Sequence, residues 1–167
     1  MNIFILSTDP KRSAKYHSDK HVVKMILESA QMLSTAIWES GGEAPYRSAY
    51  KNHPCTVWAR TSRQNFIWLT DLALALCEEY TYRYGKYHKS EEVIRYAKAN
   101  IPDIPNIGLT PFAQAMPEQY KNENPVKAYR DYYIAEKKDI NTWKYTKTPM
   151  IVTGKQVLVR CKECPEY

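Results

Sequence analysis

The sequence predicts an all-α protein: a single compact domain of about five helices, with a short extended N-terminus and a C-terminal segment patterned for a β-hairpin. Apolar residues recur at helical spacings of three and four over long stretches, and Ser, Thr, Asn, Pro and Gly stand at the ends of those stretches. With 167 residues, 44% of them hydrophobic, the chain is long enough to bury a core without disulfide or metal support.

The two longest helices are expected over Asp19–Ser40 and from Thr61 or Ser62 to Gly85. The first stops at a Gly-Gly pair and is apolar around most of its girth, so we expect it to be central and largely buried. The second begins with a hydroxyl residue suited to an N-cap and ends at a glycine suited to the C′ position.

Shorter elements are expected in the second half of the chain. One helix begins at Ser90 and ends before Pro102, a brief one opens at Thr110-Pro111 and ends by Pro117, and one opens at Asn124-Pro125 and runs to about Trp143. In the last two, a capping residue precedes a proline at the first helical position. Residues 151–160 alternate around a Thr-Gly-Lys turn, which is the pattern of a hairpin.

Charge and aromatic composition favour an anionic partner. The net charge is +6, and the chain has 14 Tyr and 4 Trp against 3 Phe. Tyr and Trp offer flat rings that can stack on bases beside phosphate-binding Lys and Arg. The alternative is that most of these aromatic residues belong to the core. We favour nucleic acids or nucleotides as partners.

No export or membrane signal is visible in the sequence. The opening MNIFILSTDP lacks a basic region, and no apolar run approaches the roughly 18 residues of a membrane span. Four cysteines without an export signal indicate reduced thiols, so we expect the protein in the cytoplasm, or in the host cytoplasm if it is viral. We also expect a monomer. Cys161 and Cys164 match half of a zinc-site pattern, and we expect no cofactor.

A polar stripe runs along the otherwise apolar first long helix. His17, His21, Lys24 and Glu28 follow one another at steps of three or four residues, so they lie on one face once the chain is helical. This face either meets solvent, with Lys24 and Glu28 as an ordinary ion pair, or lines a polar cleft. His17 and His21 also have a spacing that can hold a metal, but they lack the glutamate that the zinc-protease signature places directly after the first histidine.

Three further groups are candidates for DNA contact. Arg60 and Arg63 are expected near the start of the second long helix, where they and free amide hydrogens would form a phosphate seat beside Asn52 and His53. The alternative is a solvated arginine pair that serves the turn. Arg83 and Lys86 belong to a basic, tyrosine-rich helix end. Trp143 and Tyr145 lie among lysines and are suited to stacking or wedging between bases.

These motifs, in this order, resemble the phage pyrimidine-dimer DNA glycosylase family of the endonuclease V type. The resemblance covers about residues 1–147. It is carried by Asp19-Lys20-His21-Val22-Val23 followed by Glu28, by NHPxxxW, by YRYGKYH, by Asp103-Ile104-Pro105 with Pro111, and by Thr142-Trp143-Lys144-Tyr145. The chain looks closer still to a group of phage and bacterial proteins that carry DKHVVKMxLE, NHPC and EYTYRYGK.

The resemblance implies a helical fold and a bifunctional glycosylase/lyase, in which an N-terminal α-amine attacks C1′ and forms an imine while a glutamate stabilises the cationic intermediate. Glu28 would take the glutamate's role and His21 would contact DNA. Asn2 is too large for the initiator residue to be removed, so the amine would be that of Met1. An α-amine is a weaker base than a lysine side chain, so a larger fraction of it is unprotonated and nucleophilic near neutral pH. The family's arginine before the glutamate is Leu27 here, and Lys24 or Arg12 would supply its charge.

We therefore expect a DNA glycosylase, with AP-lyase activity as an extension, that acts on damaged or modified pyrimidines. Met1, Lys24 and Glu28 are the catalytic candidates. Residues 1–149 would form the helical catalytic and DNA-binding domain, and residues 150–167 an appendage that carries the cysteine pair. One alternative is a nucleotide- or base-modifying enzyme, metal-dependent or not, that uses the same His/Lys/Glu cleft. The other is a non-catalytic DNA-binding module in which Glu28 merely balances Lys24.

Overall fold

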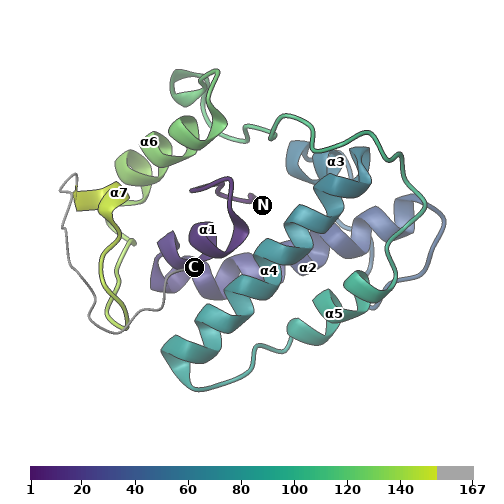
Figure 1. The fold of residues 1–167 in the computed structure, drawn as a ribbon, viewed down its shortest axis with the longest axis horizontal. Coiled ribbons are helices and arrows are strands. Elements are labelled where there is room, and N and C mark those ends of the chain that lie inside the picture. Colours follow the sequence, from purple (N-terminus) through teal and green to yellow (C-terminus); the bar gives the residue numbers. More distant parts are fainter. Residues whose placement is uncertain (154–167) are drawn as a thin grey trace.

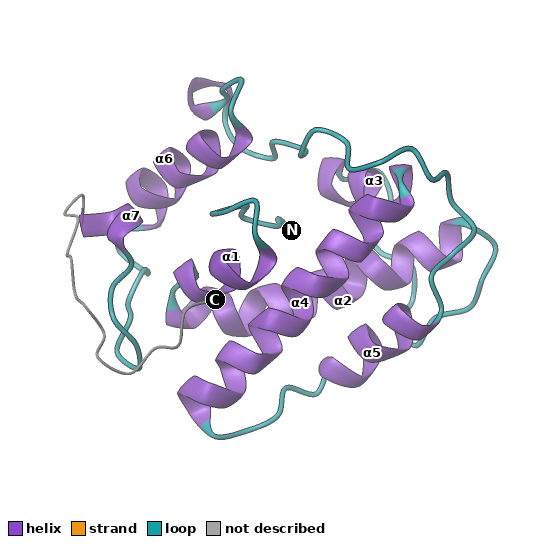
Figure 2. Ribbon diagram, viewed as in Figure 1, coloured by secondary structure: helices purple, strands orange, loops and turns teal. Residues whose placement is uncertain are grey.

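Two long helices, α2 (Asp19–Glu39) and α4 (Arg63–Tyr84), cross at the centre of the protein, and shorter helices surround them (Figure 1). The computed structural model describes residues 1–153. The remaining helices are α1 (Pro10–Tyr16), α3 (Pro54–Thr61), α5 (Glu91–Ala99), α6 (Pro125–Lys137) and α7 (Met150–Thr153), with a 3₁₀ turn η1 at Glu118–Tyr120. Within residues 1–153 every regular element is helical (Figure 2), which confirms the all-α prediction.

Both long helices begin and end close to the predicted residues, for the predicted reasons. The Ser62 hydroxyl accepts the Gln64 N–H at the start of α4. Gly85 ends that helix with φ +64°, in the left-handed region that glycine enters without steric cost. As expected of a central helix, α2 is buried along most of its length, and it packs against α3, α4 and α5.

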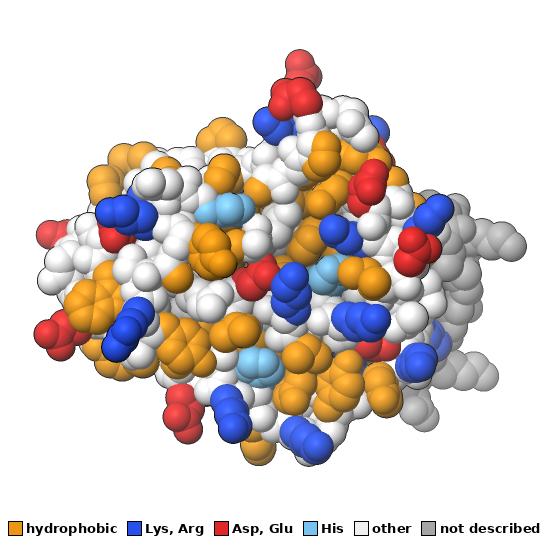
Figure 3. Space-filling view, turned by 180° about the vertical axis from the view of Figure 1, so that it is seen from behind, with side chains coloured by type: hydrophobic (Ala, Val, Ile, Leu, Met, Phe, Trp, Pro, Cys, Tyr) orange, Lys and Arg blue, Asp and Glu red, His pale blue; other side chains and the backbone are white. Residues whose placement is uncertain are grey.

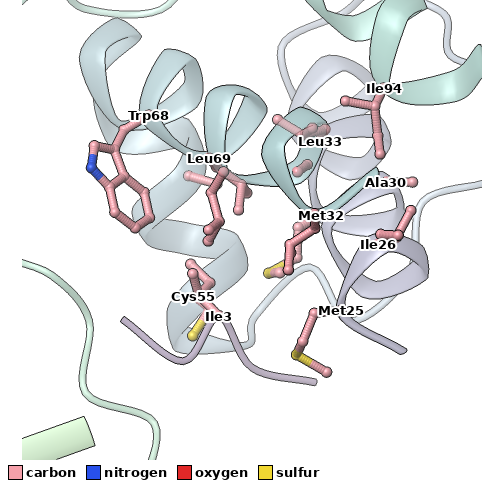
Figure 4. Packing of buried hydrophobic residues seen from close by; sticks show 14 of the residues in the cluster. Ile3, Met25, Ile26, Ala30, Met32, Leu33, Cys55, Trp68, Leu69 and Ile94 are labelled. Atoms are coloured by element: carbon pink, nitrogen blue, oxygen red, sulfur yellow. The ribbon is translucent and has the colours of Figure 1, made fainter. Parts of the chain in front are cut away.

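The core lies between α2, α3 and α4 and also takes in the extended N-terminal segment (Figure 4). Ile3, Phe4, Ile5 and Leu6 are at most 4% exposed. Full burial of one such side chain stabilises a protein by about 1.5–3 kcal/mol, so this segment is held firmly. The predicted extended N-terminus is thus an integral part of the core.

Several predicted element boundaries are wrong. Residues 110–117 are not helical, and the helix that begins after Asn124 ends at Lys137 rather than near Trp143. Helices α1 and α3 were not predicted. Residues 151–153 of the predicted hairpin lie in α7, and its remainder, like Cys161 and Cys164, lies outside the described residues.

The irregular chain from residue 100 to residue 124 runs from α5 across the α3–α4 junction to α6 (Figure 1). Pro105 O accepts the Arg63 N–H at 2.8 Å, and Asn65 exchanges two hydrogen bonds with Thr110, of 3.0 and 2.7 Å. These bonds hold Thr110 extended, which explains why its capping signal does not begin a helix. Within residues 1–153 no helix is both long and apolar enough to cross a membrane.

Candidate active site

The polar face of α2 opens into a hollow of about 310 Å³ lined by His21, Lys24 and Glu28. The N-terminal segment and α6 with the turn after it supply the other principal lining residues: Met1, Asn2, Phe4, Tyr132, Lys137 and Ile140. The sequence left open whether this face meets solvent or a cleft, and the structure places it in a hollow. Figure 3 shows the molecule from behind, the side on which α2 lies, with an acidic side chain near the middle and Lys or Arg beside it.

The buried N-terminal segment brings the start of the chain to Glu28. The Asn2 N–H donates to Glu28 Oε2 at 2.8 Å, and the Met1 α-amine lies 3.8 Å from the same oxygen. The Asn2 side chain donates to Ala115 O at 2.8 Å, which ties the segment to the chain before α6. The α-amine and a carboxylate are therefore held next to each other at the hollow.

Glu28 lies between two cations of different character. Its Oε1 is 3.5 Å from Lys24 Nζ, and its side chain is 10% exposed, whereas that of Lys24 is 66% exposed. Lys24 can therefore swing toward a ligand at small cost. The Met1 side chain is only 2% exposed and packs against α3, where Thr56 Oγ1 lies 3.4 Å from Met1 Sδ. The α-amine is thus the better fixed of the two amines near the carboxylate.

His21 is held as a neutral ring at the edge of the hollow. Its Nδ1 lies 2.7 Å from the Tyr133 hydroxyl and 3.0 Å from Ser18 Oγ. The Tyr133 hydroxyl also accepts the Ser18 N–H at 2.9 Å and donates to Ser18 Oγ at 3.2 Å, so Ser18, His21 and Tyr133 form one hydrogen-bonded group. Burial lowers the pKa of His21 to about 3, so the ring stays neutral at physiological pH. His21 therefore lines the hollow as an uncharged hydrogen-bonding group rather than as a cation.

The Phe4 ring packs against the His21 ring, and the backbone of Phe4 has an uncommon conformation. Its φ of +52° lies in the left-handed region, which bulky residues rarely enter. In this conformation its ring lies 4.9 Å from the His21 ring and 5.1 Å from the Tyr133 ring, centroid to centroid. Backbone strain of this kind persists where surrounding contacts impose it, and it clusters at functional sites.

His53 lies at the start of α3, next to the residues of that helix that contact Asn2 and Met1. Its ring caps α3 by accepting the Cys55 N–H at Nδ1, at 3.2 Å. Burial lowers the pKa of His53, the positive charge of the N-terminal amine lowers it further, and Glu28 raises it. These influences put the half-buried ring within electrostatic reach of both Met1 and Glu28. Asn52, next to it, is exposed.

The expected phosphate seat at Arg60 and Arg63 is not formed. Arg60 lies in the last turn of α3 rather than at the start of α4, and its Nη1 donates to Lys51 O at 2.6 Å. The Arg63 N–H is bound by Pro105 O and the Gln64 N–H by Ser62 Oγ, so these amide hydrogens are not free for a phosphate. The Arg63 side chain is exposed, which leaves it free to meet a phosphate in another way.

His17 and Arg83 lie in the interior, where DNA cannot reach them without rearrangement. His17 is fully buried, its Nδ1 bonds Ser13 O at 2.8 Å, and burial lowers its pKa to about 4. The Arg83 side chain, 0% exposed, binds Asp19 at 3.2 Å and Glu79 at 2.9 Å. These residues support the start of α2. Both side chains are buried by residues that are distant from them in the sequence. This burial contradicts the prediction that they contact DNA.

The aromatic segment near the C-terminus divides in two. Trp143 is half-buried and its indole N–H donates to His17 O at 3.1 Å, so it anchors the segment to the start of α2. Tyr145 is 53% exposed, with its ring centroid 5.1 Å from that of Tyr84 at the end of α4. Lys86 is exposed just beyond that helix. Tyr145 and Lys86 therefore remain accessible, whereas Trp143 is committed to the fold.

Sequence reasoning missed the part of the site that comes from distant segments. Asn2 and Phe4 carry no local motif, and Tyr132 and Tyr133 lie within a helix that the sequence predicted without giving either residue a role in the site. Their roles depend on contacts across more than a hundred residues, such as Ser18 with Tyr133. As for a metal centre at His17 and His21, residues 1–153 contain no group of three or more His, Cys, Asp or Glu side chains placed to hold an ion.

One comparison with known proteins identifies a family for this chain. Residues 1–94 match the family model of pyrimidine dimer DNA glycosylase, a stretch that includes Met1, His21 and Glu28 and exceeds half of the 167 residues. Neither the curated proteins nor the solved structures yielded a match. The family acts on DNA, which makes DNA the expected substrate class. The chain therefore belongs to the pyrimidine dimer DNA glycosylase family.

Proposed function

We propose that this protein is a DNA glycosylase with AP-lyase activity, that it acts on damaged or modified pyrimidines, and that the Met1 α-amine is its nucleophile. The observation that carries the proposal is the 3.8 Å approach of that amine to Glu28 Oε2, at a hollow that His21 and Lys24 also line. Family membership supports a base-excising reaction, and the held amine supports its covalent form.

In the proposed reaction the unprotonated amine attacks C1′ of the target nucleotide. The bond from C1′ to the pyrimidine nitrogen breaks, the base leaves with the bonding electrons and takes a proton from solvent, and the sugar ring opens to leave an imine between Met1 and C1′. A proton then leaves C2′ and the C3′–O bond breaks, which releases the 3′ phosphate. Hydrolysis of the imine restores the free amine.

Each residue at the hollow has a role in these steps. Glu28 stabilises the positive imine and accepts the C2′ proton. His21 forms a hydrogen bond with the sugar or the base, and Lys24 binds a phosphate or the departing pyrimidine. The net charge of +6 and exposed residues such as Arg63, Lys86 and Tyr145 favour binding along the DNA backbone. Excision from a duplex also requires the target to leave the stack.

Borohydride trapping followed by peptide mapping tests this proposal. The substrates are duplexes that carry a thymine dimer, a modified pyrimidine or an abasic site, so base release and strand cleavage are measured separately. We expect a reduced covalent adduct on the N-terminal peptide that begins with Met1. An adduct on the peptide containing Lys24 would reject the α-amine as nucleophile. Absence of both adduct and base release on every substrate would reject the glycosylase itself.

A blocked N-terminus provides the matched control. A protein extended by two residues before Met1 displaces the amine from Glu28, and we expect the adduct to disappear. A Lys24→Arg variant, which keeps the charge but lacks a primary amine, should still form it. Thermal unfolding of both proteins checks that they are folded, and intact mass of the unextended protein confirms that Met1 is retained.

A further inference from the structure

Tyr50 has an unusual combination of exposure and backbone strain. Its side chain is 70% exposed, and its φ of +51° lies in the left-handed region. Outside glycine that region is populated mainly by Asn, Asp and His, and a bulky aromatic residue there is an outlier. An exposed side chain has no packing reason of its own to accept such a backbone conformation. The neighbouring residues must therefore impose it.

Hydrogen bonds hold the chain on both sides of Tyr50. The Ala49 N–H donates to Thr35 Oγ1 at 2.9 Å, and that hydroxyl lies 3.1 Å from Ala49 O. On the other side Arg60 Nη1 donates to Lys51 O at 2.6 Å, and the His53 N–H closes a turn on Tyr50 O at 2.9 Å. Tyr50 is therefore presented to solvent on a fixed backbone rather than on a loose loop.

The position of this turn places Tyr50 beside the candidate active site. His53 ends the turn that Tyr50 begins, so their Cα atoms lie within the roughly 7 Å that defines a β-turn. His53 caps α3, and the first turn of that helix contacts the start of the chain: Cys55 Sγ lies 3.9 Å from Asn2 Oδ1, and Thr56 Oγ1 lies 3.4 Å from Met1 Sδ. Thr35, which holds Ala49, lies two turns beyond Glu28 on α2. The turn that carries Tyr50 is thus fixed between α2 and the end of α3 that contacts Met1 and Asn2.

The surroundings of Tyr50 suit a nucleic acid. Arg47 and Lys51 are exposed on the same loop, and the Arg60 side chain is hydrogen-bonded to this loop at Lys51 O. Tyrosine rings stack on every kind of base because each base has a π-face. By contrast, Trp143, one of the two residues that the sequence offered for stacking or wedging, is half-buried with its N–H engaged, and the other, Tyr145, lies against Tyr84 at the end of α4.

We propose that Tyr50 stacks on a DNA base next to the target nucleotide and holds open the space that this nucleotide leaves when it moves to the Met1 amine. The proposal rests on the proposed function and adds a specificity-determining residue to it. The fixed backbone favours this role, because a side chain presented on a rigid turn loses less conformational entropy when DNA binds.

Tyr50→Asn is the informative change, because Asn tolerates the left-handed backbone and has no ring. Tyr50→Gly repeats the test with a residue that adopts this φ freely. Tyr50→Phe keeps the ring, and Tyr87→Asn removes another exposed tyrosine, 81% exposed, from a loop beyond α4. All four variants should keep the thermal unfolding temperature within a few degrees of wild type, and unfolding of Tyr50→Asn alone would leave Tyr50→Gly as the test.

The probe is a duplex that contains a stable abasic-site analogue flanked by the fluorescent base 2-aminopurine. We expect wild type, Tyr50→Phe and Tyr87→Asn to bind it with a change in 2-aminopurine fluorescence. Tyr50→Asn and Tyr50→Gly should bind about tenfold or more weakly and lose that change, as expected when an aromatic–base stack is removed. Equal affinity and fluorescence, within twofold, for wild type and both ringless variants would overturn the stacking proposal.

Base release from a damaged duplex separates this result from the proposed function. Wild type that excises bases, together with ringless variants indistinguishable from it in binding and fluorescence, would overturn the stacking role alone. Wild type that excises nothing but binds with a Tyr50-dependent signal would overturn the glycosylase and support stacking. Wild type that neither binds nor excises would overturn both.

Discussion

Glu28→Gln removes a negative charge next to the α-amine while keeping the size of the side chain and an oxygen that can accept the Asn2 N–H. The Met1 amine and Glu28 Oε2 are 3.8 Å apart, and at an effective dielectric constant near 20 a unit charge pair at that distance is worth about 4 kcal/mol. In the proposed reaction a positive imine nitrogen occupies nearly the same place. Losing that attraction in the transition state corresponds to about a 10³-fold slower step.

Single-turnover strand cleavage and glycosidic-bond cleavage on a duplex with a thymine dimer measure this effect, with thymine release scored after photoreversal because the cyclobutane ring otherwise keeps the cleaved base on its neighbour. We expect Glu28→Gln to slow release by about 10³-fold. Glu39 lies on the same helix and pairs with Lys51 at 4.0 Å, outside the hollow. The rate of the Glu39→Gln control variant should therefore remain near that of wild type. Thermal unfolding verifies that both variants are folded. A Glu28→Gln rate within about fivefold of wild type would refute the electrostatic argument, because the substitution removes the negative charge while keeping the shape of the side chain.

Two further predictions concern stability. Arg83→Met leaves two buried carboxylates without their cation and should lower the free energy of unfolding by about 3–5 kcal/mol in urea titrations, whereas the exposed Arg95→Met should change it little; equal effects would contradict the assigned burial. The pKa values of His17 and His21, lowered by burial to about 4 and about 3 from 6.5, mean that the unfolded chain binds more protons below pH 6.5. Stability should therefore be greatest above pH 6.5 and fall by about 1.4 kcal/mol per pH unit for each histidine as pH decreases toward 4. Denaturant unfolding from pH 8 to pH 5 checks this, and a flat profile would show that the rings are not buried neutral.

The parts of the fold that the sequence predicted are those set by local physics. The helices α2 and α4 have long apolar stripes with end signals, and these decide the structure regardless of context. Asn124-Pro125 began a helix as expected, whereas Thr110-Pro111, with the same signal, did not, because Asn65 binds both the Thr110 N–H and its hydroxyl. Equivalent local signals thus led to different structures through one distant side chain.

The two unpredicted helices are short and have signals that are easily overlooked. The first, α1, opens with Asp9 as N-cap and Pro10 at the first position, the same signal as Asn124-Pro125, over only seven residues. The cap of α3 is the imidazole of His53, an uncommon N-cap, before Pro54. A systematic search for a capping residue followed by proline would have found α1.

For the candidate site, helical spacing was enough to group His21, Lys24 and Glu28, because one helix carries all three. It could not separate them from His17, which has the same spacing but lies under the aromatic rings of Phe4 and Tyr133. Likewise Arg83 ends a basic, tyrosine-rich helix, yet it points inward to Asp19. Burial of this kind depends on which segment packs above a residue, and no local pattern records that.

The tie between Asn2 and Ala115, 113 positions apart, sets when the proposed nucleophile can take its place. During synthesis the first residues leave the ribosome long before their partner does, so the amine stays unpositioned until more than two thirds of the polypeptide has emerged. Fusion tags placed ahead of Met1 would interrupt the same closure in recombinant protein. In the nascent chain, the proposed reactivity is thus acquired late, as a property of the finished fold.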